Sequence, residues 1–207
     1  MRLVCISDTH KYYTNLDMPE GDVLIHAGDI DVYENITEVY HFKKWLDKQK
    51  YRYKLVIAGN HDRMFELAND LCRSILSDSC TYLENSQTTI KGIKFWGSPI
   101  TPTFMNWYFM ANRGDDITRY WDMIPKDTDV LITHGPPMKI LDKTADGDYA
   151  GCYDLARIIK QIKPKVHVFG HIHEGAGQVK IGDTTYINAS VLDENYDLVN
   201  KPIVIDI

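Results

Sequence analysis

The sequence lacks any long hydrophobic run. Its apolar stretches, such as Leu3 to Ile6 and Leu55 to Ala58, are far shorter than the roughly 18 apolar residues that a membrane-spanning helix needs. The first eight residues contain one basic residue and an apolar run much shorter than the hydrophobic region of a signal peptide. These two absences predict a cytoplasmic protein with no membrane partner.

Cysteine is scarce, and the sequence contains no C-x-x-C pair. The four cysteines are Cys5, Cys72, Cys80 and Cys152, and the first of them lies inside an apolar run of strand type. Disulfide-stabilised secreted domains and thiolate metal sites usually show closely spaced cysteines. We therefore expect reduced thiols, in agreement with a cytoplasmic location.

The chain also lacks an excess of basic residues. It has 23 Lys and Arg against 29 Asp and Glu, which gives a formal net charge of −6. Non-specific nucleic-acid binding needs a basic surface that replaces the counterions of the phosphates, so no stable nucleic-acid binding is expected. A small anionic substrate is compatible with this charge, because bound divalent metals would reverse the sign locally. Nothing in the sequence indicates an oligomeric partner.

What the sequence does contain is a regular alternation of apolar runs and amphipathic segments. The predicted buried strands are 2–7, 22–27, 54–58, 129–133 and 165–169, and the predicted helices are 35–49, 62–76, 115–123 and 152–163. A hairpin is expected at 88–96, and short β-runs in the tail from 178 to 207. The alternation predicts βαβ crossovers and largely parallel strands. No repeat or linker interrupts it, so one α/β domain over residues 1–207 is expected.

Each of the five apolar runs ends in polar residues that could bind metal or transfer protons. In chain order these residues are Asp8 and His10, then Asp29, then Asn60, His61 and Asp62, then His134, and last His171 and His173. Ligands of open α/β sheets bind beyond the carboxyl ends of the strands, and parallel strands bring those ends to one edge. Two pairs, Asp8 with His10 and His171 with His173, have the spacing that points both side chains to one side of an extended backbone. The sequence thus predicts one cluster of carboxylate, imidazole and amide groups.

The composition of this cluster predicts a site for two divalent metal ions. A carboxylate, histidine and amide set without cysteine suits Mn, Fe, Zn, Co or Ni, of which Mn²⁺ is favoured here. The seven candidate ligands are Asp8, His10, Asp29, Asn60, His134, His171 and His173, more than one metal needs. Two metals that share one carboxylate would use them all. Asp29 is the natural bridge, because it is the only candidate that its strand supplies.

A pair of metals about 3.5–4 Å apart is the arrangement used for in-line displacement at phosphorus by a metal-bridging hydroxide. His61 is the histidine not needed as a ligand, so we expect it to protonate the leaving oxygen as a general acid. Asp62 could orient His61, or could simply cap a helix. Asn60, His61 and Arg113 are the candidate substrate-binding residues; Arg113 could instead form a surface ion pair.

Three other histidines and one aromatic cluster have alternative interpretations. His26 and His167 are expected to be buried and structural, and His41 to be solvated on a helix. The aromatic residues Phe104, Trp107, Tyr108 and Phe109 could stack a nucleobase, although core packing is the more common use of such residues.

The motifs together resemble the signature of the calcineurin-like metallophosphoesterase superfamily. They are Asp8-x-His10, Gly28-Asp29, Gly59-Asn60-His61-Asp62, His134 and Gly170-His171-x-His173. The resemblance implies a four-layer α/β/β/α sandwich. It also implies one metal held by Asp8, His10, Asp29 and His173, and a second held by Asp29, Asn60, His134 and His171.

A narrower resemblance is to the MPPED-type metallophosphoesterase-domain proteins. It is based on Trp96-Gly97-Ser98-Pro99, Asn112-Arg113-Gly114, the run Ile132 to Pro137, the run His171 to Gly175, and the run Tyr186 to Ser190. That group is associated with hydrolysis of cyclic-nucleotide phosphodiesters, which implies a small phosphodiester as substrate. The rival hypotheses are a phosphomonoesterase or protein phosphatase, a nuclease, and a metal-binding scaffold without catalytic activity.

Overall fold

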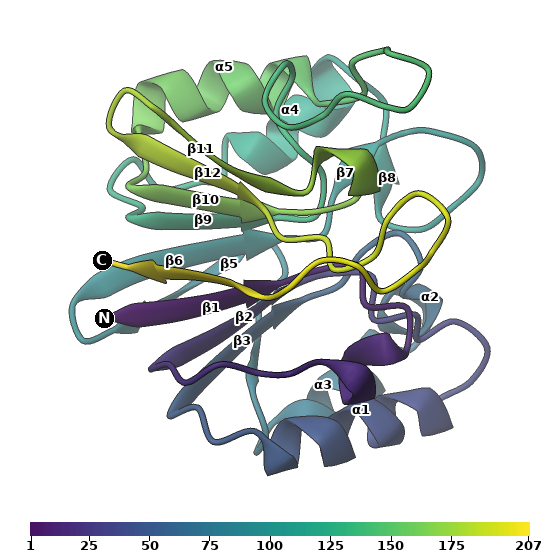
Figure 1. Ribbon diagram of the computed structural model, residues 1–207. Helices are drawn as coiled ribbons and strands as arrows, with labels where there is room; N and C mark the ends of the chain where they lie inside the picture. The colour runs from purple at the N-terminus through teal and green to yellow at the C-terminus, as the bar shows by residue number, and fades with distance from the viewer.

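Two β-sheets packed face to face form the centre of the computed structural model, which describes all residues 1–207 (Figure 1). The first sheet has the strand order β13-β1-β2-β3-β4. Its strands are β1 (Arg2–Ile6), β2 (Val23–Ala27), β3 (Tyr53–Ile57), β4 (Thr81–Tyr82) and β13 (Ile203–Asp206). Strands β1 to β4 run parallel, whereas β13 pairs with β1 in the antiparallel direction.

The second sheet has the order β11-β12-β10-β9-β6-β5. Its strands are β5 (Ser86–Ile90), β6 (Ile93–Ser98), β9 (Val130–Thr133), β10 (Val166–Phe169), β11 (Gly177–Ile181) and β12 (Thr184–Asn188). The predicted hairpin is β5 with β6, and it turns at Lys91 and Gly92, both with positive φ. A separate pair, β7 (Thr101–Pro102) with β8 (Met110–Ala111), lies in the aromatic segment.

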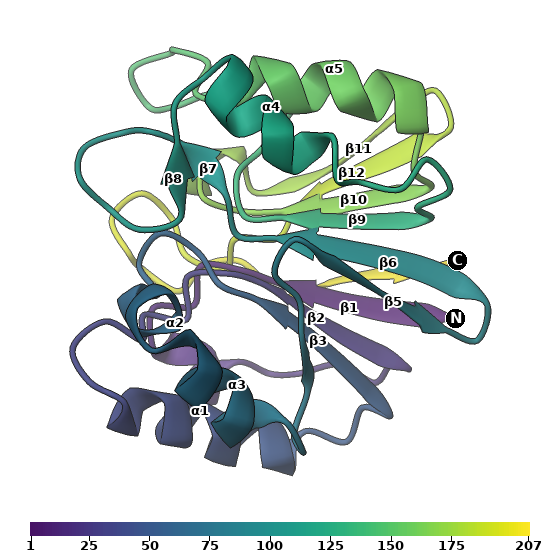
Figure 2. The same ribbon diagram turned by 180° about the vertical axis from the view of Figure 1, so that it is seen from behind.

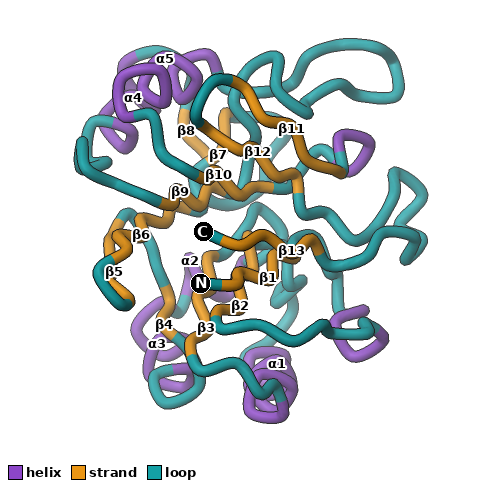
Figure 3. Tube along the Cα trace, turned by 60° about the vertical axis from the view of Figure 1, so that its left-hand side comes forward, coloured by secondary structure: helices purple, strands orange, loops and turns teal.

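Helices cover the outer face of each sheet and complete four layers. One face is covered by α1 (Thr37–Lys48), α2 (Arg63–Leu67) and α3 (Asn69–Leu76), and the other by α4 (Asp115–Trp121) and α5 (Tyr153–Ile162) (Figure 2). Two short 3₁₀ helices, η1 (Tyr12–Asn15) and η2 (His173–Gly175), lie in loops. Figure 3 separates the two strand layers from the helices outside them. The expected α/β/β/α sandwich is therefore confirmed.

The central strands are buried on both faces, which is why they are apolar throughout. In β1, Leu3 and Cys5 belong to the core between the sheets, whereas Val4 and Ile6 face the helix layer. This is the alternation expected of side chains along a strand. All four cysteines are free thiols, as expected. None of the helices combines the length and the hydropathy that crossing a membrane requires.

Two expectations about secondary structure were wrong. The helix predicted over 62–76 is divided at Ala68 (φ −132°, ψ 44°) into α2 and α3. There the side-chain amide of Asn69 donates to the carbonyl oxygen of Phe65 (2.8 Å), which gives that carbonyl a partner other than a helical N–H. The five predicted strands also do not share one sheet edge, because β1 to β3 and β9 to β10 lie in different sheets.

Backbone pairing joins the two sheets just beyond the end of β1. The N–H of Ser7 donates to the carbonyl of Ala189 (2.8 Å), and the N–H of Val191 donates to the carbonyl of Ser7 (3.1 Å). The carboxyl ends of the parallel strands therefore meet at one end of the sandwich, the right-hand end in Figure 1.

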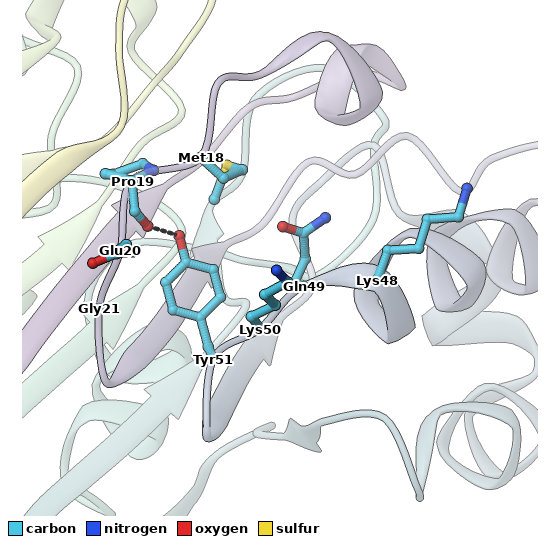
Figure 4. Close-up of a pocket in the computed structure, with 8 residues that line it drawn as sticks. All are labelled: Met18, Pro19, Glu20, Gly21, Lys48, Gln49, Lys50 and Tyr51. Carbon is cyan, nitrogen blue, oxygen red and sulfur yellow. Dashed lines mark hydrogen bonds between the residues drawn. The ribbon is translucent and has the colours of Figure 1, made fainter.

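The opposite end of the sandwich contains the termini and a cavity of about 520 Å³ (Figure 4). The segments that precede β2 and β3 form this cavity, and the hydroxyl of Tyr51 there donates to the carbonyl of Pro19. None of the predicted site residues lines it. The functional site must therefore be sought at the carboxyl ends of the strands.

Candidate active site

The predicted ligands come together at the carboxyl ends of the strands, where the two sheets meet. Asp8, His10 and His173 form one group, and Asp8, Asp29 and His134 form another; within each group the potential ligand atoms lie within 4.8 Å of one another. All five of these side chains are buried. The first sheet provides the residues after β1 and β2, and the second provides those after β9 and β10.

Asp29 lies between two histidines, His10 and His134. Its Oδ2 is 3.6 Å from Nε2 of His10, and its Oδ1 is 3.3 Å from Nε2 of His134. Two further contacts connect the cluster, one made by His134 and one by Asp8. Nε2 of His134 is 2.8 Å from Oδ1 of Asn60. The Asp8 Oδ1 is 3.5 Å from Nε2 of His173.

His171 lies on the side of the second group. Its ring centroid is 5.1 Å from that of His134 in an edge-to-face arrangement, and its backbone N–H donates to the carboxylate of Asp8 at 3.0 Å. The structure thus brings all seven predicted ligands together at one end of the sandwich.

Backbone carbonyls fix the orientation of two of the histidines. Nδ1 of His134 is 2.9 Å from the carbonyl oxygen of Ala27, and Nδ1 of His173 is 2.8 Å from that of Asp193. A hydrogen bond to Nδ1 directs the other ring nitrogen, Nε2, toward the carboxylates. This use of a carbonyl to set the tautomer is common for metal-binding histidines.

The local backbone is strained around these ligands. Asp8, His10, Asp29 and His171 all have positive φ, between 38° and 70°. Non-glycine residues rarely adopt this region, and such residues concentrate at functional sites. The sharp turns redirect the chain just after β1, β2 and β10.

Glycines next to the ligands allow close approach between segments. A Cβ at Gly170 would lie 1.9 Å from Oδ2 of Asp8, and one at Gly59 would lie 2.2 Å from Oδ1 of Asp29. Any side chain at these positions would displace the carboxylate, which explains the glycine in the two motifs Gly59-Asn60 and Gly170-His171.

In this cluster, burial and neighbouring charges of opposite sign shift the pKa values in opposite directions. Burial raises the pKa of Asp8, but the hydrogen bond and charge of His173 outweigh it and lower that pKa to about 2. Burial lowers the pKa of His134 and of His173, but Asp29 and Asp8 respectively outweigh it and raise both to about 9. Burial lowers the pKa of His10, and that of His171 to about 4.

These shifts predict that metal binding releases protons. Because the pKa of His134 and of His173 is about 9, both imidazoles carry a proton at neutral pH in the metal-free protein. A metal ligand must be deprotonated, so loading should release about two protons near pH 7. Metal affinity should rise with pH until the pKa of about 9 is passed. Calorimetry of Mn²⁺ binding in two buffers that differ in ionisation enthalpy measures the release; equal heats in both buffers would contradict the prediction.

The donor set fits a pair of divalent cations. Nε2 of His10 and Nδ2 of Asn60 are buried without a hydrogen-bond partner, although buried polar atoms are normally satisfied. The cluster offers carboxylate oxygen, imidazole nitrogen and amide oxygen, and none of the four thiols takes part in it. Metal ions at this end of the sandwich would satisfy Nε2 of His10, and a ligand held beside them could accept from Nδ2 of Asn60.

His61 lies beside the cluster and is partly exposed. Its backbone N–H donates to Oδ1 of Asp29 (2.8 Å). Its ring is 5.0 Å from that of His10 and 4.8 Å from that of Trp107, measured between centroids. The potential ligand atoms of His61, His10 and Asp31 also lie within 4.8 Å of one another, so the imidazole is held at the edge of the cluster.

The expected orientation of His61 by Asp62 was wrong. The buried carboxylate of Asp62 instead accepts four backbone N–H groups, from Gly59 (2.8 Å), Ile30 (3.2 Å), Asp31 (2.9 Å) and Val32 (3.1 Å). Burial, followed by the negative charge of Asp29, raises the pKa of Asp62 to about 7. Asp62 therefore ties the loop after β2 to the loop after β3, and the rings of Trp107 and His10 flank His61.

Asp62→Ala should destabilise the protein strongly. Four backbone N–H groups would lose their acceptor, three of them in one loop, which should lower the free energy of unfolding by about 3 kcal/mol or more. Urea unfolding of the metal-free variant measures this loss. Asp70→Ala is the matched control, because Asp70 is exposed in the first turn of α3. An Asp62→Ala protein of unchanged stability but reduced turnover would restore the orienting role.

Arg113 does not form the surface ion pair that was its alternative role. Its guanidinium donates to the carbonyls of Gly151 (2.8 Å) and Ala150 (3.0 Å). It lines a cavity of about 470 Å³ together with Phe104, Trp107 and His171. A predicted metal ligand and a predicted substrate-binding residue thus share one cavity, with two aromatic rings in its wall.

The remaining histidines behave as expected. Nε2 of His26 is 3.0 Å from the hydroxyl of Thr9, Nε2 of His167 is 2.8 Å from that of Thr133, and both histidines are fully buried. His41 is exposed on α1. Asp193, whose carbonyl orients His173, was not among the predicted site residues, because no motif marks it.

Comparisons with known proteins agree with this geometry. The sequence profile described as calcineurin-like phosphoesterase matches residues 1–175. Metallophosphoesterase domain-containing protein 1 of Homo sapiens is 42% identical over an alignment 230 positions long, which covers 100% of this chain and 71% of that protein. A UPF0046 protein of Caenorhabditis elegans is 37% identical over 218 residues, covering 99% of this chain and 74% of that protein.

A solved structure supports the fold. The crystal structure of TT1561 of Thermus thermophilus aligns with a TM-score of 0.62 at 12% identity, covering 90% of this chain and 88% of that one. The sequence matches and the two ligand groups together settle the family. The chain belongs to the calcineurin-like phosphoesterases, a family of hydrolases that depend on a dinuclear metal centre.

Proposed function

We propose that this protein is a phosphodiesterase that hydrolyses small phosphodiesters, cyclic nucleotides among them, with two divalent metal ions. The position of Asp29 is the main support for this proposal. Its carboxylate oxygens lie 3.6 Å from His10 and 3.3 Å from His134, on opposite sides of one buried group. A carboxylate so placed can be shared by two cations.

In this proposal Asp8, His10, Asp29 and His173 hold one metal ion, and Asp29, Asn60, His134 and His171 hold the other. Mn²⁺ is favoured, with Fe, Zn, Co or Ni as alternatives. When bound, the pair supplies an activated water for in-line attack and positive charge against the phosphoryl oxygens.

The other roles are assigned to groups that the ligand set leaves free. Nδ2 of Asn60 is a buried donor without a partner, so it can donate to a phosphoryl oxygen. His61 is flanked by aromatic rings and partly exposed, so its imidazole can reach a substrate oxygen and protonate it as the ester bond breaks. Arg113 uses two of its nitrogens for carbonyls and retains further N–H donors toward the cavity.

A diester is favoured over a monoester because of the cavity beside His171. A space of about 470 Å³ lined by Trp107 and Phe104 can accommodate an organic substituent on the phosphorus. Aromatic rings in the wall suit a planar substituent such as a nucleobase. A monoester with a small leaving group would leave this space without a role.

A screen of metal-reconstituted protein tests the proposal. It should include 2′,3′- and 3′,5′-cyclic nucleotides, bis-p-nitrophenyl phosphate, p-nitrophenyl phosphate and single-stranded DNA. We expect turnover of the diesters to exceed that of the monoester. Faster monoester hydrolysis would favour a phosphomonoesterase or protein phosphatase, DNA degradation would favour a nuclease, and stoichiometric metal without turnover would favour a scaffold.

A further inference from the structure

Tyr196 lies against the two histidines of the first group of predicted ligands. Its ring centroid is 4.8 Å from that of His10 and 5.2 Å from that of His173, in edge-to-face contacts. Its hydroxyl has no hydrogen-bond partner in the protein, and the residue is 46% exposed. The tyrosine lies outside residues 1–175 that match the family profile, and no sequence motif marks it.

The loop that presents Tyr196 is built around Asp193. The carboxylate of Asp193 accepts the backbone N–H groups of Asn195 and Asp197, each at 2.9 Å. Its carbonyl accepts the N–H of Tyr196 (3.0 Å) and is 2.8 Å from Nδ1 of His173. One residue therefore holds the turn and orients a predicted metal ligand, which fixes Tyr196 relative to the site.

The conformation of Tyr196 is itself unusual. Its φ is 64°, in the left-handed region that bulky residues seldom adopt. Glycine or asparagine would relieve the backbone strain at this position, so the side chain itself must have a use there. Packing alone explains little, because almost half of the residue remains exposed.

We propose that the hydroxyl of Tyr196 donates a hydrogen bond to a non-bridging oxygen of the bound phosphoester, on the side of His10 and His173. A phenol is neutral and protonated near pH 7, so it can donate to an anionic oxygen without itself replacing a carboxylate or imidazole ligand. The inference rests on the proposed function, because it needs a phosphoryl group at this cluster.

Tyr196→Phe tests the contact, because it removes the hydroxyl and keeps the ring on the two histidines. Binding of inorganic phosphate to the Mn²⁺-loaded protein should weaken by roughly tenfold, the value expected for a lost hydrogen bond to a charged group. The KM for bis-p-nitrophenyl phosphate should rise in parallel. Mn²⁺ affinity, measured by calorimetry without phosphate, should stay unchanged.

Tyr153→Phe is the matched control, because Tyr153 is an exposed tyrosine on α5 and should give wild-type values throughout. Unchanged phosphate affinity in Tyr196→Phe would overturn the proposal and leave the ring with a packing role. Weakened Mn²⁺ binding would also overturn it, since the hydroxyl would then act through the metal site. If the wild-type protein binds phosphate but hydrolyses no ester, the proposed function is rejected. The difference in phosphate affinity between the wild-type protein and Tyr196→Phe would still test the hydrogen bond of Tyr196.

Discussion

Asp29→Ala should abolish the binding of both metal ions and reduce turnover by roughly 10³-fold or more, because metal ions supply several kcal/mol of transition-state stabilisation in such sites. The carboxylate faces His10 on one side and His134 on the other, so its loss leaves both of the proposed ligand sets incomplete. It also accepts the backbone N–H of His61, so the proposed proton donor would lose this hydrogen bond at the same time.

Metal content after dialysis and turnover of bis-p-nitrophenyl phosphate are the two measurements for this variant. Asp22→Ala is the matched control, because Asp22 lies at the opposite end of the same strand, where its carboxylate accepts the N–H of Arg2 (2.8 Å). The control should keep its metal and its activity. An Asp29→Ala protein that retains two metals would show that Asp29 is not the shared ligand.

His61→Ala should keep both metal ions and lose roughly 10²- to 10⁴-fold in turnover, the usual contribution of a general acid. The loss should depend on the leaving group. A p-nitrophenolate needs little help from a proton, whereas an alkoxide such as a ribose oxygen needs it most. The variant should therefore lose much more activity on a cyclic nucleotide than on bis-p-nitrophenyl phosphate.

The ratio of the two losses is the informative quantity, because a general disturbance of the site would slow both substrates equally. His41→Ala provides the control, since His41 is a solvent-exposed histidine on α1. Equal losses on both substrates would remove His61 from proton transfer and leave it a role in binding.

The clustering of the seven predicted ligands could be predicted from sequence because each follows an apolar strand, and ligands of open α/β sheets bind beyond the carboxyl ends of the strands. The sequence could not show that β1 to β3 and β9 to β10 form separate sheets. That division depends on contacts between segments far apart in the chain, such as the pairing of β6 with β9, whereas the pairing of Ser7 with Ala189 joins the two sheets.

The contacts of Asp62 also could not be predicted from the sequence. Its position next to His61 favoured an orienting role, but the backbone of residues 30 to 32 approaches the same carboxylate from another strand end. The contact of Tyr196 with His10 could not be predicted either. Tyr196 follows His10 by 186 residues, in a loop made of ordinary turn residues. Neighbours in sequence predict which groups are available, whereas tertiary contacts decide which of them meet.

Phosphoester hydrolysis by this protein should require two bound metal ions. Titration of the metal-free protein with Mn²⁺, while the hydrolysis of bis-p-nitrophenyl phosphate is followed and bound metal is measured in parallel, tests this requirement. We expect little activity with the first equivalent and full activity when the second is bound. Full activity with one bound ion, or two bound ions without turnover of this or any other phosphoester, would contradict it.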